Sequence, residues 1–262
     1  MKYDVAIIGA GMAGLTAGIY ASRAGKSVLI FESGAIGGQI ITAPSVENWP
    51  GSFRISGADL MQDIKNQAAE LGAEIRYEEV VEIAKKDKTF LVTTDEDEYI
   101  AGTIIVAMGT EPRRLSEKQA KDAGDRAISY CATCDGALYK GKPVVVVGSG
   151  NTAKQEMAYL KNIASKVYHI HHDDPIPEDA EAVFVAIGRV TNTGFLKGLV
   201  DLDDNGYVIA GEDCVTSCPG VFVAGDCRVK EVRQLVTAAA DGAVAAEAAV
   251  SYLSELYFLC FI

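Results

Sequence analysis

Positive charge is scarce in this sequence, and long apolar runs are absent. Lys and Arg number 24 against 36 Asp and Glu, which gives a net charge of -12. A surface of this sign repels a phosphate backbone, so we expect no nucleic-acid partner. No apolar run approaches the roughly 20 residues that a membrane span needs, and the run from Val5 to Ile8 is too short for a signal-peptide core. We therefore expect no membrane association and a cytoplasmic location.

Histidine is also rare, with three residues, His169, His171 and His172, at one place in the chain. This scarcity argues against hydrolases built on a Ser/His/Asp or Cys/His arrangement. With Asp173 the three histidines form a candidate metal site. Alternate residues of a strand face opposite ways and no fourth ligand is fixed, so we favour a solvated strand end and expect no metal.

The remaining composition is that of a globular protein with redox chemistry. Of 262 residues, 49% are hydrophobic and 23% charged, which excludes a disordered chain and allows one large domain or two of modest size. There are six cysteines, two of them spaced Cys131-x-x-Cys134. This spacing fits a cytosolic redox motif better than a secreted disulfide framework.

Glycine clusters follow short β-branched runs, the pattern of a strand that turns into a helix. Two such strand-helix-strand units are predicted, over residues 3–31 and 144–170. Other predicted elements are helices over 58–71 and 234–256, an antiparallel set of strands within 73–99, and strands at 103–107, 182–187 and 220–224. The sequence predicts an α/β fold with two Rossmann-like (three-layer ββα) nucleotide-binding units, the second inserted in the first and shortened. We place the discontinuous domain at 1–112 and 191–262 and the inserted one at 113–190.

The shortening is visible after the strand that ends at Ile170. The chain runs His171-His172-Asp173-Asp174-Pro175-Ile176-Pro177, and the next strand begins at Ala182. A doubly wound domain normally continues through a crossover helix, and none fits in this interval.

Gly9-Ala10-Gly11-Met12-Ala13-Gly14 stands between a predicted strand and a predicted helix, and Glu32 ends the next strand. Glycines let the backbone approach a pyrophosphate, the helix N-terminus favours its charge, and the carboxylate can accept hydrogen bonds from a ribose. We favour a dinucleotide site over a tight turn without a ligand.

Several further motifs carry a family resemblance. They are Gly37-Gly38-Gln39, Val46-Glu47-Asn48-Trp49-Pro50-Gly51, Cys131-Ala132-Thr133-Cys134-Asp135-Gly136, Gly148-x-Gly150-Asn151-Thr152-Ala153, and Gly225-Asp226 with Arg233-Gln234. Together with the first glycine turn, they make the sequence resemble the low-molecular-weight thioredoxin reductases nearly end to end.

This resemblance implies that FAD is bound by the discontinuous domain, with Asn48 beside the ring system and Asp226 near the ribityl chain. It also implies a homodimer. The FAD-binding residues that it implies are Gly9, Gly11, Ala13, Gly14, Glu32, Ser33, Gly37, Gly38, Gln39, Asn48, Val80, Ala107, Gly109, Gly225, Asp226, Arg233, Gln234 and Leu235.

Cys131 and Cys134 are the candidate catalytic pair, since two sulfurs at this spacing can close a small disulfide and a thiolate can attack a partner's disulfide. The resemblance implies that Cys134 lies nearer the flavin, that Cys131 attacks the disulfide of thioredoxin, and that Asp135 manages the proton. The alternative is half of a zinc site completed by Cys214 and Cys218. We favour the disulfide.

The electron donor is where the sequence departs from the family. NADPH-dependent members of the family carry an arginine-rich stretch where this chain has His171-His172-Asp173-Asp174. Acidic side chains at this place repel the 2'-phosphate of NADPH. They can instead accept a hydrogen bond from the 2'-hydroxyl of NADH. NADPH binding is therefore doubtful. The deletion resembles the ferredoxin-dependent flavin thioredoxin reductases, and we expect ferredoxin as the donor.

Three alternatives stay open. The alternatives to a ferredoxin-dependent enzyme are an NADPH- or NADH-dependent thioredoxin reductase with a compact second domain, a non-catalytic flavoprotein, and a nucleotide-responsive binding protein.

Residues 113–142 carry seven Lys or Arg and four Asp or Glu. In one interpretation this patch steers acidic ferredoxin or thioredoxin towards the cysteine pair. In the other it is an ordinary surface of mixed charge.

The apolar tail from Tyr257 to Ile262 needs a surface to cover. One hypothesis places Tyr257, Phe258 or Phe261 against the flavin ring. The other is a helix end packed into a core or an untethered terminus.

Overall fold

The chain divides into two compact units in a computed structural model that describes residues 2–258, with side chains through residue 256. One unit contains the residues up to Thr110 and those from Thr191 onward, and the other spans Glu111–Val190. The aromatic tail proposed to cover the flavin lies outside the described side chains. Among the described helices, none combines the length and apolarity that a membrane crossing requires.

The first unit is built on a 7-stranded sheet. Its parallel part contains β3 (Glu74–Arg76), β2 (Val28–Phe31), β1 (Lys2–Ile8), β6 (Glu98–Val106) and β13 (Val221–Val223). The strands β4 (Val80–Lys86) and β5 (Thr89–Thr94) form a hairpin that continues antiparallel from β6. All four residues of β2 are buried, as expected of a strand covered on both faces.

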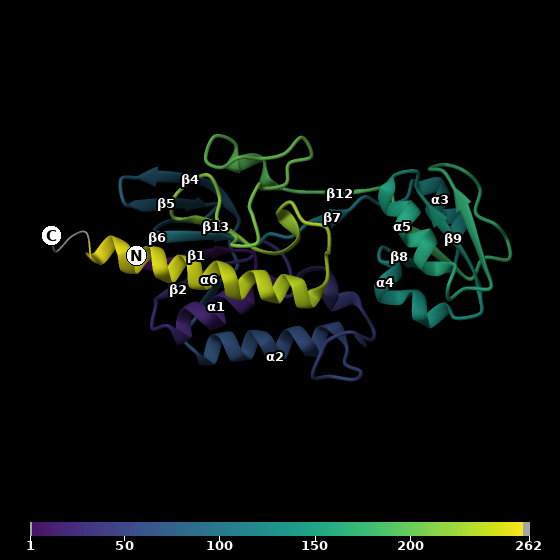
Figure 1. The fold of residues 1–262 in the computed structure, drawn as a ribbon, viewed down its shortest axis with the longest axis horizontal. Coiled ribbons are helices and arrows are strands. Elements are labelled where there is room, and N and C mark those ends of the chain that lie inside the picture. The colour runs from purple at the N-terminus through teal and green to yellow at the C-terminus, as the bar shows by residue number, and fades with distance from the viewer. Residues whose placement is uncertain (1, 259–262) are drawn as a thin grey trace. The chain divides into compact units, whose positions relative to one another are not determined.

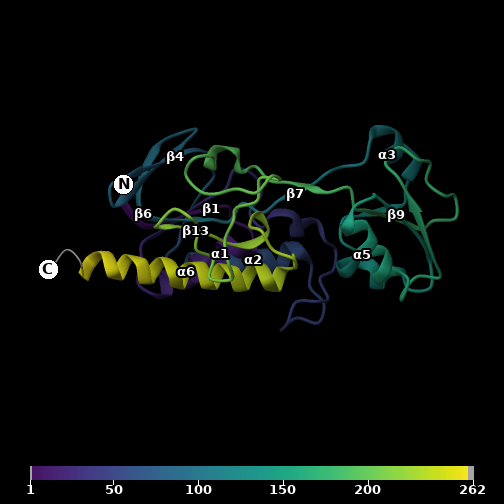
Figure 2. The same ribbon diagram turned by 45° about the horizontal axis from the view of Figure 1, so that its top comes forward.

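Three layers result in this unit (Figures 1 and 2). The helices α1 (Met12–Arg23), α2 (Gly57–Glu70) and α6 (Leu235–Phe258) pack on one face of the sheet, and the β4–β5 hairpin covers part of the other. The alanine-rich helix α6 packs closely on α1. A Cβ atom at Gly242 of α6 would lie 2.2 Å from the carbonyl oxygen of Ala13, so only glycine permits this approach.

The second unit has a 4-stranded parallel sheet in the order β10-β9-β11-β8. Its strands are β8 (Ala127–Ser129), β9 (Pro143–Val147), β10 (Lys166–Ile170) and β11 (Ala182–Val185). The helices α4 (Ala132–Asp135) and α5 (Asn151–Leu160) share one core cluster with the sheet, and α3 (Glu117–Ala123) contributes to a second cluster. The short strands β7 (Glu111–Pro112) and β12 (Arg189–Val190) pair where the chain enters and leaves the unit.

Four 3-10 helices complete the described elements: η1 (Gly38–Thr42), η2 (Gly136–Tyr139), η3 (Thr193–Leu196) and η4 (Gly225–Cys227).

The predicted fold class is confirmed, including the shortened second unit. Residues 171–181 connect β10 to β11 through turns and contain no helix. Side chains from α3 and the residues after it hold this connection. Gln119 Nε2 donates to the carbonyl oxygens of His171 and Asp174, both at 3.1 Å, and Arg126 Nε donates to that of Ala180 at 2.7 Å. These bonds satisfy backbone groups that a crossover helix would otherwise pair.

The close contact of α1 and α6 yields a first prediction. In Gly242→Val the new side chain must push Ala13 away, so we expect a loss of at least about 2 kcal/mol in the free energy of unfolding, measured by urea denaturation. Gly194→Ala is the matched control, because a Cβ atom there meets nothing within 4 Å. Equal stability of the two variants would contradict the packing argument.

Candidate functional site

The first glycine turn has the geometry of a phosphate-binding loop. Gly9 has a φ of 104°, and Gly11 is the N-cap of α1 with φ -79° and ψ -172°. No side chain caps the helix, and a Cβ atom at Gly11 would meet nothing within 4 Å. A Cβ atom at Gly14 would lie 1.9 Å from the oxygen of Gly9. The turn therefore leaves backbone N–H groups of the helix start uncapped by any side chain, which fits a pyrophosphate.

The carboxylate of Glu32 lies beside this turn. Its Oε2 accepts from the Ala10 amide at 2.8 Å and its Oε1 from the Gly34 amide at 2.9 Å. The Gly37 amide donates to the Ala10 carbonyl at 2.8 Å, which brings the start of η1 to the same place. Ser33 and Gly38 lie exposed on this segment.

The structure brings other predicted residues to the same end of the sheet. A Cβ atom at Gly9 would lie 2.5 Å from the oxygen of Ala107, and one at Gly225 would lie 2.9 Å from Ala13 Cβ. Gln39 Nε2 donates to the carbonyl of Thr110, one residue beyond Gly109.

The chain segments before α2 and before α6 meet through another predicted pair. Asn48 Nδ2 donates to Gln234 Oε1 at 3.0 Å, and Leu235, half-buried at the start of α6, packs on the core. Val80 is placed differently, since its buried side chain belongs to the core beneath the β4–β5 hairpin.

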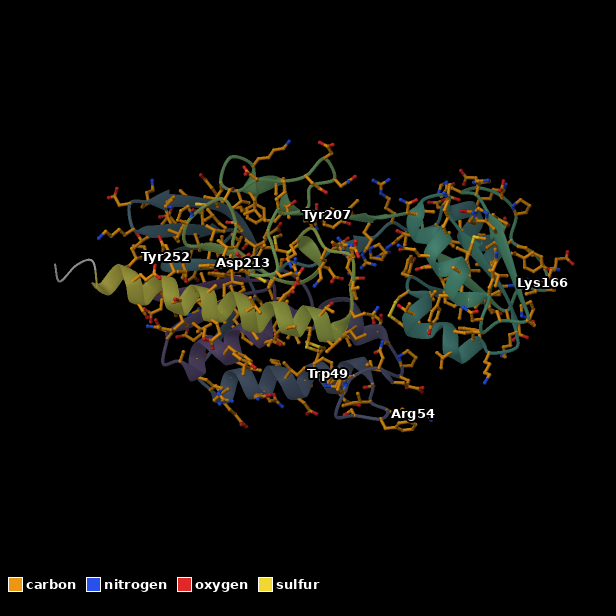
Figure 3. All side chains as sticks on the ribbon, viewed as in Figure 1. Trp49, Arg54, Lys166, Tyr207, Asp213 and Tyr252 are labelled. Carbon is orange, nitrogen blue, oxygen red and sulfur yellow. A yellow bond between two sulfur atoms is a disulfide. The ribbon has the colours of Figure 1, made fainter. Side chains whose placement is uncertain are left out.

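Arg233 organises the turn that contains Asp226. Its guanidinium donates to the carbonyl oxygens of Asp226 at 3.4 Å and Lys230 at 2.9 Å. It also lies over the ring of Tyr207, 4.6 Å from the centroid, and Figure 3 labels this tyrosine. The cation is thereby fixed by backbone oxygens and by an aromatic face.

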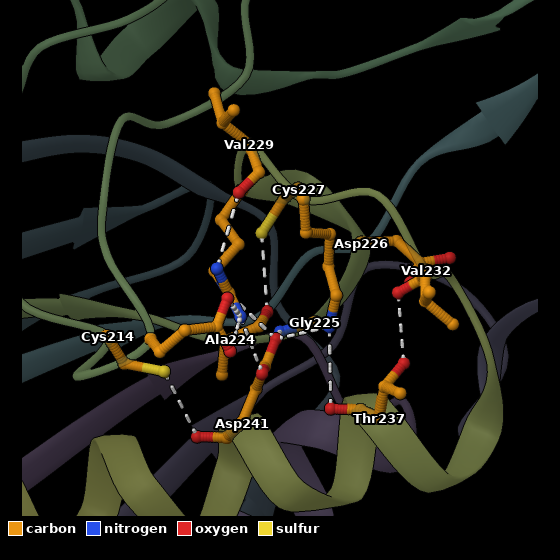
Figure 4. Close-up of polar contacts among 12 residues, drawn as sticks. Cys214, Ala224, Gly225, Asp226, Cys227, Val229, Val232, Thr237 and Asp241 are labelled. Atoms are coloured by element: carbon orange, nitrogen blue, oxygen red, sulfur yellow. Dashed lines mark hydrogen bonds and ion pairs between the residues drawn. The ribbon is translucent and has the colours of Figure 1, made fainter.

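A buried ionic cluster anchors the same turn to α6, as Figure 4 shows. Asp241, with 6% of its surface exposed, accepts from the Gly225 amide at 2.9 Å, Arg228 Nε at 2.9 Å and Lys230 Nζ at 2.7 Å. Burial alone would raise the pKa of Asp241, but the hydrogen bonds from Arg228 and Lys230 outweigh it and hold the pKa below the usual value. Sequence reasoning missed this cluster, although a lone Asp in an alanine-rich helix was a usable signal.

Cys131 and Cys134 form a disulfide with a Cα–Cα distance of 5.3 Å. The sequence favoured this disulfide over a zinc site. Cys214, Cys218 and Cys227 are buried thiols in the other unit. Burial raises the pKa of Cys214 to about 12 and that of Cys227 to about 11, so neither is a reactive thiolate near neutral pH.

Two polar side chains that the sequence did not single out contact the redox helix α4. Ser129 Oγ donates to Asp135 Oδ2 at 2.6 Å. Glu156 of α5 accepts a hydrogen bond from the Ala132 backbone. Burial raises the pKa of Glu156 to about 7, and the bond from Ala132 and the charge of Arg189 counteract this only in part.

The second glycine turn repeats the backbone of the first. Gly150, the N-cap of α5, has φ -81° and ψ -175°, and no side chain caps the helix. Its surroundings differ, because His171 Nδ1 lies 2.9 Å from Ser149 Oγ and His169 Nε2 lies 2.6 Å from the Gly148 carbonyl. His172 contacts Asp173 at 3.1 Å. The three histidines are exposed, and no described group of His, Cys, Asp or Glu residues has the arrangement of a metal site.

Comparison with known proteins identifies the family. The sequence profile described as "Pyridine nucleotide-disulphide oxidoreductase" matches residues 3–178 and 171–243. A thioredoxin reductase of Treponema pallidum is 37% identical, over 97% of this chain and 98% of its own. The chain belongs to the low-molecular-weight thioredoxin reductase family. It is a thioredoxin-reductase-like disulfide oxidoreductase with a CxxC pair, and the family implies FAD.

Solved structures agree with this assignment. The thioredoxin reductase of Streptococcus pyogenes matches with a TM-score of 0.90 and 31% identity, over 97% of this chain and 99% of its own. A ferredoxin-flavin thioredoxin reductase of Clostridium acetobutylicum matches with a TM-score of 0.64 and 29% identity, over 98% and 99%.

The comparisons also agree with a shortened second unit. The alignment with the Treponema relative spans 302 positions, more than the 262 residues of this chain, so the relative has residues that this chain lacks. The two segments that match the family profile overlap at residues 171–178. This overlap lies in the β10–β11 connection.

The ionic cluster yields a second prediction. Asp241→Ala leaves Arg228 and Lys230 buried without their carboxylate, so we expect a loss of about 3 to 5 kcal/mol in the free energy of unfolding, measured in urea by circular dichroism. Glu212→Ala is the control, because Glu212 also pairs with Arg228 but has 93% of its side chain exposed. We expect that control to lose less than about 1 kcal/mol. Equal losses of unfolding free energy in the two variants would contradict the argument that the stabilisation comes from burial of the ion pair.

Proposed function

We propose that the chain is an FAD enzyme that reduces thioredoxin through Cys131 and Cys134 and receives its electrons from ferredoxin or a similar one-electron carrier. The observation that carries the choice of donor is the β10–β11 connection. It lacks the crossover helix and places Asp173 and Asp174 after the strand that follows the second glycine turn.

FAD fits the first unit by the geometry of its glycine turn. The N–H groups at the start of α1, which no side chain caps, would take the pyrophosphate, and the Glu32 carboxylate would take the adenosine ribose. The pair Asn48 and Gln234 and the turn at Gly225-Asp226 are assigned to the ring system and ribityl chain. When bound, FAD supplies the electron pair that opens the disulfide.

The cysteine pair would then pass this electron pair to thioredoxin by disulfide exchange. The Cys131 thiolate bonds to one sulfur of the thioredoxin disulfide, and that disulfide breaks. Cys134 then attacks Cys131, which restores the Cys131–Cys134 disulfide and releases the second thioredoxin sulfur. Asp135 holds the proton that the departing sulfur takes up.

An acidic electron carrier or thioredoxin is assigned to the basic surface of the second unit. Arg113, Arg114, Lys118, Lys121 and Lys140 are exposed. Arg126, in contrast, is engaged with backbone carbonyls. A positive surface on a chain of net charge -12 would favour encounter with acidic proteins. The homodimer implied by the family stays a prediction.

One observation favours an NADPH- or NADH-dependent enzyme instead. The second glycine turn keeps the backbone angles of the first, and a Cβ atom at Gly150 would meet nothing within 4 Å. A dinucleotide could still approach this turn with its pyrophosphate. The two donor hypotheses are therefore separated by experiment.

The donor prediction uses stopped-flow flavin reduction under anaerobic conditions. Reduced ferredoxin should bleach the flavin, whereas NADPH should give no saturable reduction at physiological concentrations, because like charges oppose its 2'-phosphate and no crossover covers the nicotinamide. Calorimetry with NADPH is the matching binding measurement. Tight NADPH binding with rapid bleaching would favour the pyridine-nucleotide alternative.

The prediction for the cysteine pair separates enzyme from non-catalytic flavoprotein. Cys131→Ser should leave a reducible flavin, with a charge-transfer band if the Cys134 thiolate contacts it, and should lower thioredoxin turnover by about a thousandfold or more. Cys218→Ser, a buried cysteine of the other unit, is the control and should keep turnover. Normal turnover in Cys131→Ser would exclude the proposed exchange.

A further inference from the structure

Ser129 is the last residue of β8, two positions before the first cysteine of the redox pair. Its side chain lies at the end of a parallel strand, where the chain turns into α4, and only 5% of the residue is exposed. A buried hydroxyl must find hydrogen-bond partners, and its partners here are two functional residues.

The hydroxyl joins Asp135 to Cys131. Ser129 Oγ donates to Asp135 Oδ2 at 2.6 Å and accepts from the Cys131 backbone amide at 3.2 Å. A third contact, with the Cys131 carbonyl at 3.4 Å, is longer. A serine hydroxyl has one proton, and the short contact to a carboxylate is where that proton goes.

We propose that Ser129 is a positioning residue that fixes the Asp135 carboxylate relative to Cys131 and so speeds disulfide exchange. This inference rests on the proposed function, in which Asp135 holds the proton for that exchange. A hydroxyl that donates to a carboxylate stabilises its ionised form and restricts its rotamer. Through the Cys131 amide the same hydroxyl ties the carboxylate to the start of the redox helix.

Removal of the Ser129 hydroxyl should change the rate of disulfide exchange in one direction only. In Ser129→Ala the carboxylate of Asp135 loses the donor that restricts its rotamer, so it is held less often beside Cys131 and exchange slows. The Cys131 amide loses its acceptor at the same time. Ser129→Thr keeps a hydroxyl and should restore both bonds.

Other titratable groups surround the redox helix. Tyr139 of η2 has its pKa raised by burial and then by the charge of Asp135, and Lys142 and Glu181 also act on it. Glu156 of α5 contacts the helix through Ala132, and Arg189 of β12 acts on Glu156.

Glu156 requires a dedicated control, because its pKa of about 7 falls inside the assay range. The parent for every comparison is therefore the Glu156→Gln holoenzyme. Glutamine keeps the oxygen that accepts from Ala132 and does not titrate.

The test has two readouts on the parent and on the same protein with Ser129→Ala or Ser129→Thr. In the first, enzyme reduced anaerobically with dithionite is mixed with oxidised thioredoxin between pH 5.5 and 9. In the second, the pH dependence of Cys131 alkylation by iodoacetamide is measured on the reduced enzyme without thioredoxin. The second readout needs no partner, so it tests Ser129 even if the parent does not reduce thioredoxin, a result that would count against the proposed function alone.

We expect Ser129→Ala to slow exchange about tenfold at neutral pH. It should raise the rate of Cys131 alkylation about threefold, because a carboxylate that is no longer held beside Cys131 repels its thiolate less. Ser129→Thr should return both towards the parent. With Asp135→Asn already present, Ser129→Ala should have no further effect on either rate, because the two residues act as one unit. Unchanged rates in Ser129→Ala, or the same changes with Asp135→Asn present, would overturn the inference.

Discussion

The end of the first unit to which we assign FAD depends on the buried carboxylate of Asp241. This one side chain binds the Gly225 amide, Arg228 and Lys230, and it belongs to the helix whose Gly242 contacts α1. The turn with Asp226 is thus tied to the helix that starts at the first glycine turn. A charge buried at this position is stable only with its partners, so α1, α6 and the turn hold their positions together.

The two glycine turns show how one backbone conformation can serve different roles. Gly11 and Gly150 have nearly the same φ and ψ, and both helices begin without a capping side chain. Glu32 lies beside the first turn and accepts hydrogen bonds from two backbone N–H groups. His169 and His171 instead contact the second turn. In the proposed function, the surroundings of the turn, rather than the turn itself, separate the FAD site from a turn that does not bind NADPH.

The sequence predicted the fold because its signals are local. Strands such as β9 are apolar runs that end at glycines, and the interval from Ile170 to Ala182 is too short for a helix. The helix α3, the strand β8 and the roles of Ser129 and Asp241 were missed, because each depends on contacts that the folded chain creates. Even so, the Cys131–Cys134 disulfide and the contact of Asn48 with Gln234 involve residues already singled out by sequence.

The central claim is that electrons pass from the flavin through Cys131 and Cys134 to thioredoxin. The most direct measurement is an anaerobic titration of fully reduced holoenzyme with oxidised thioredoxin, followed by flavin absorbance. Flavin and dithiol together hold about four electrons, and each thioredoxin disulfide accepts two, so the account predicts complete flavin reoxidation after about two equivalents. A flavin that stays reduced in excess thioredoxin would contradict it.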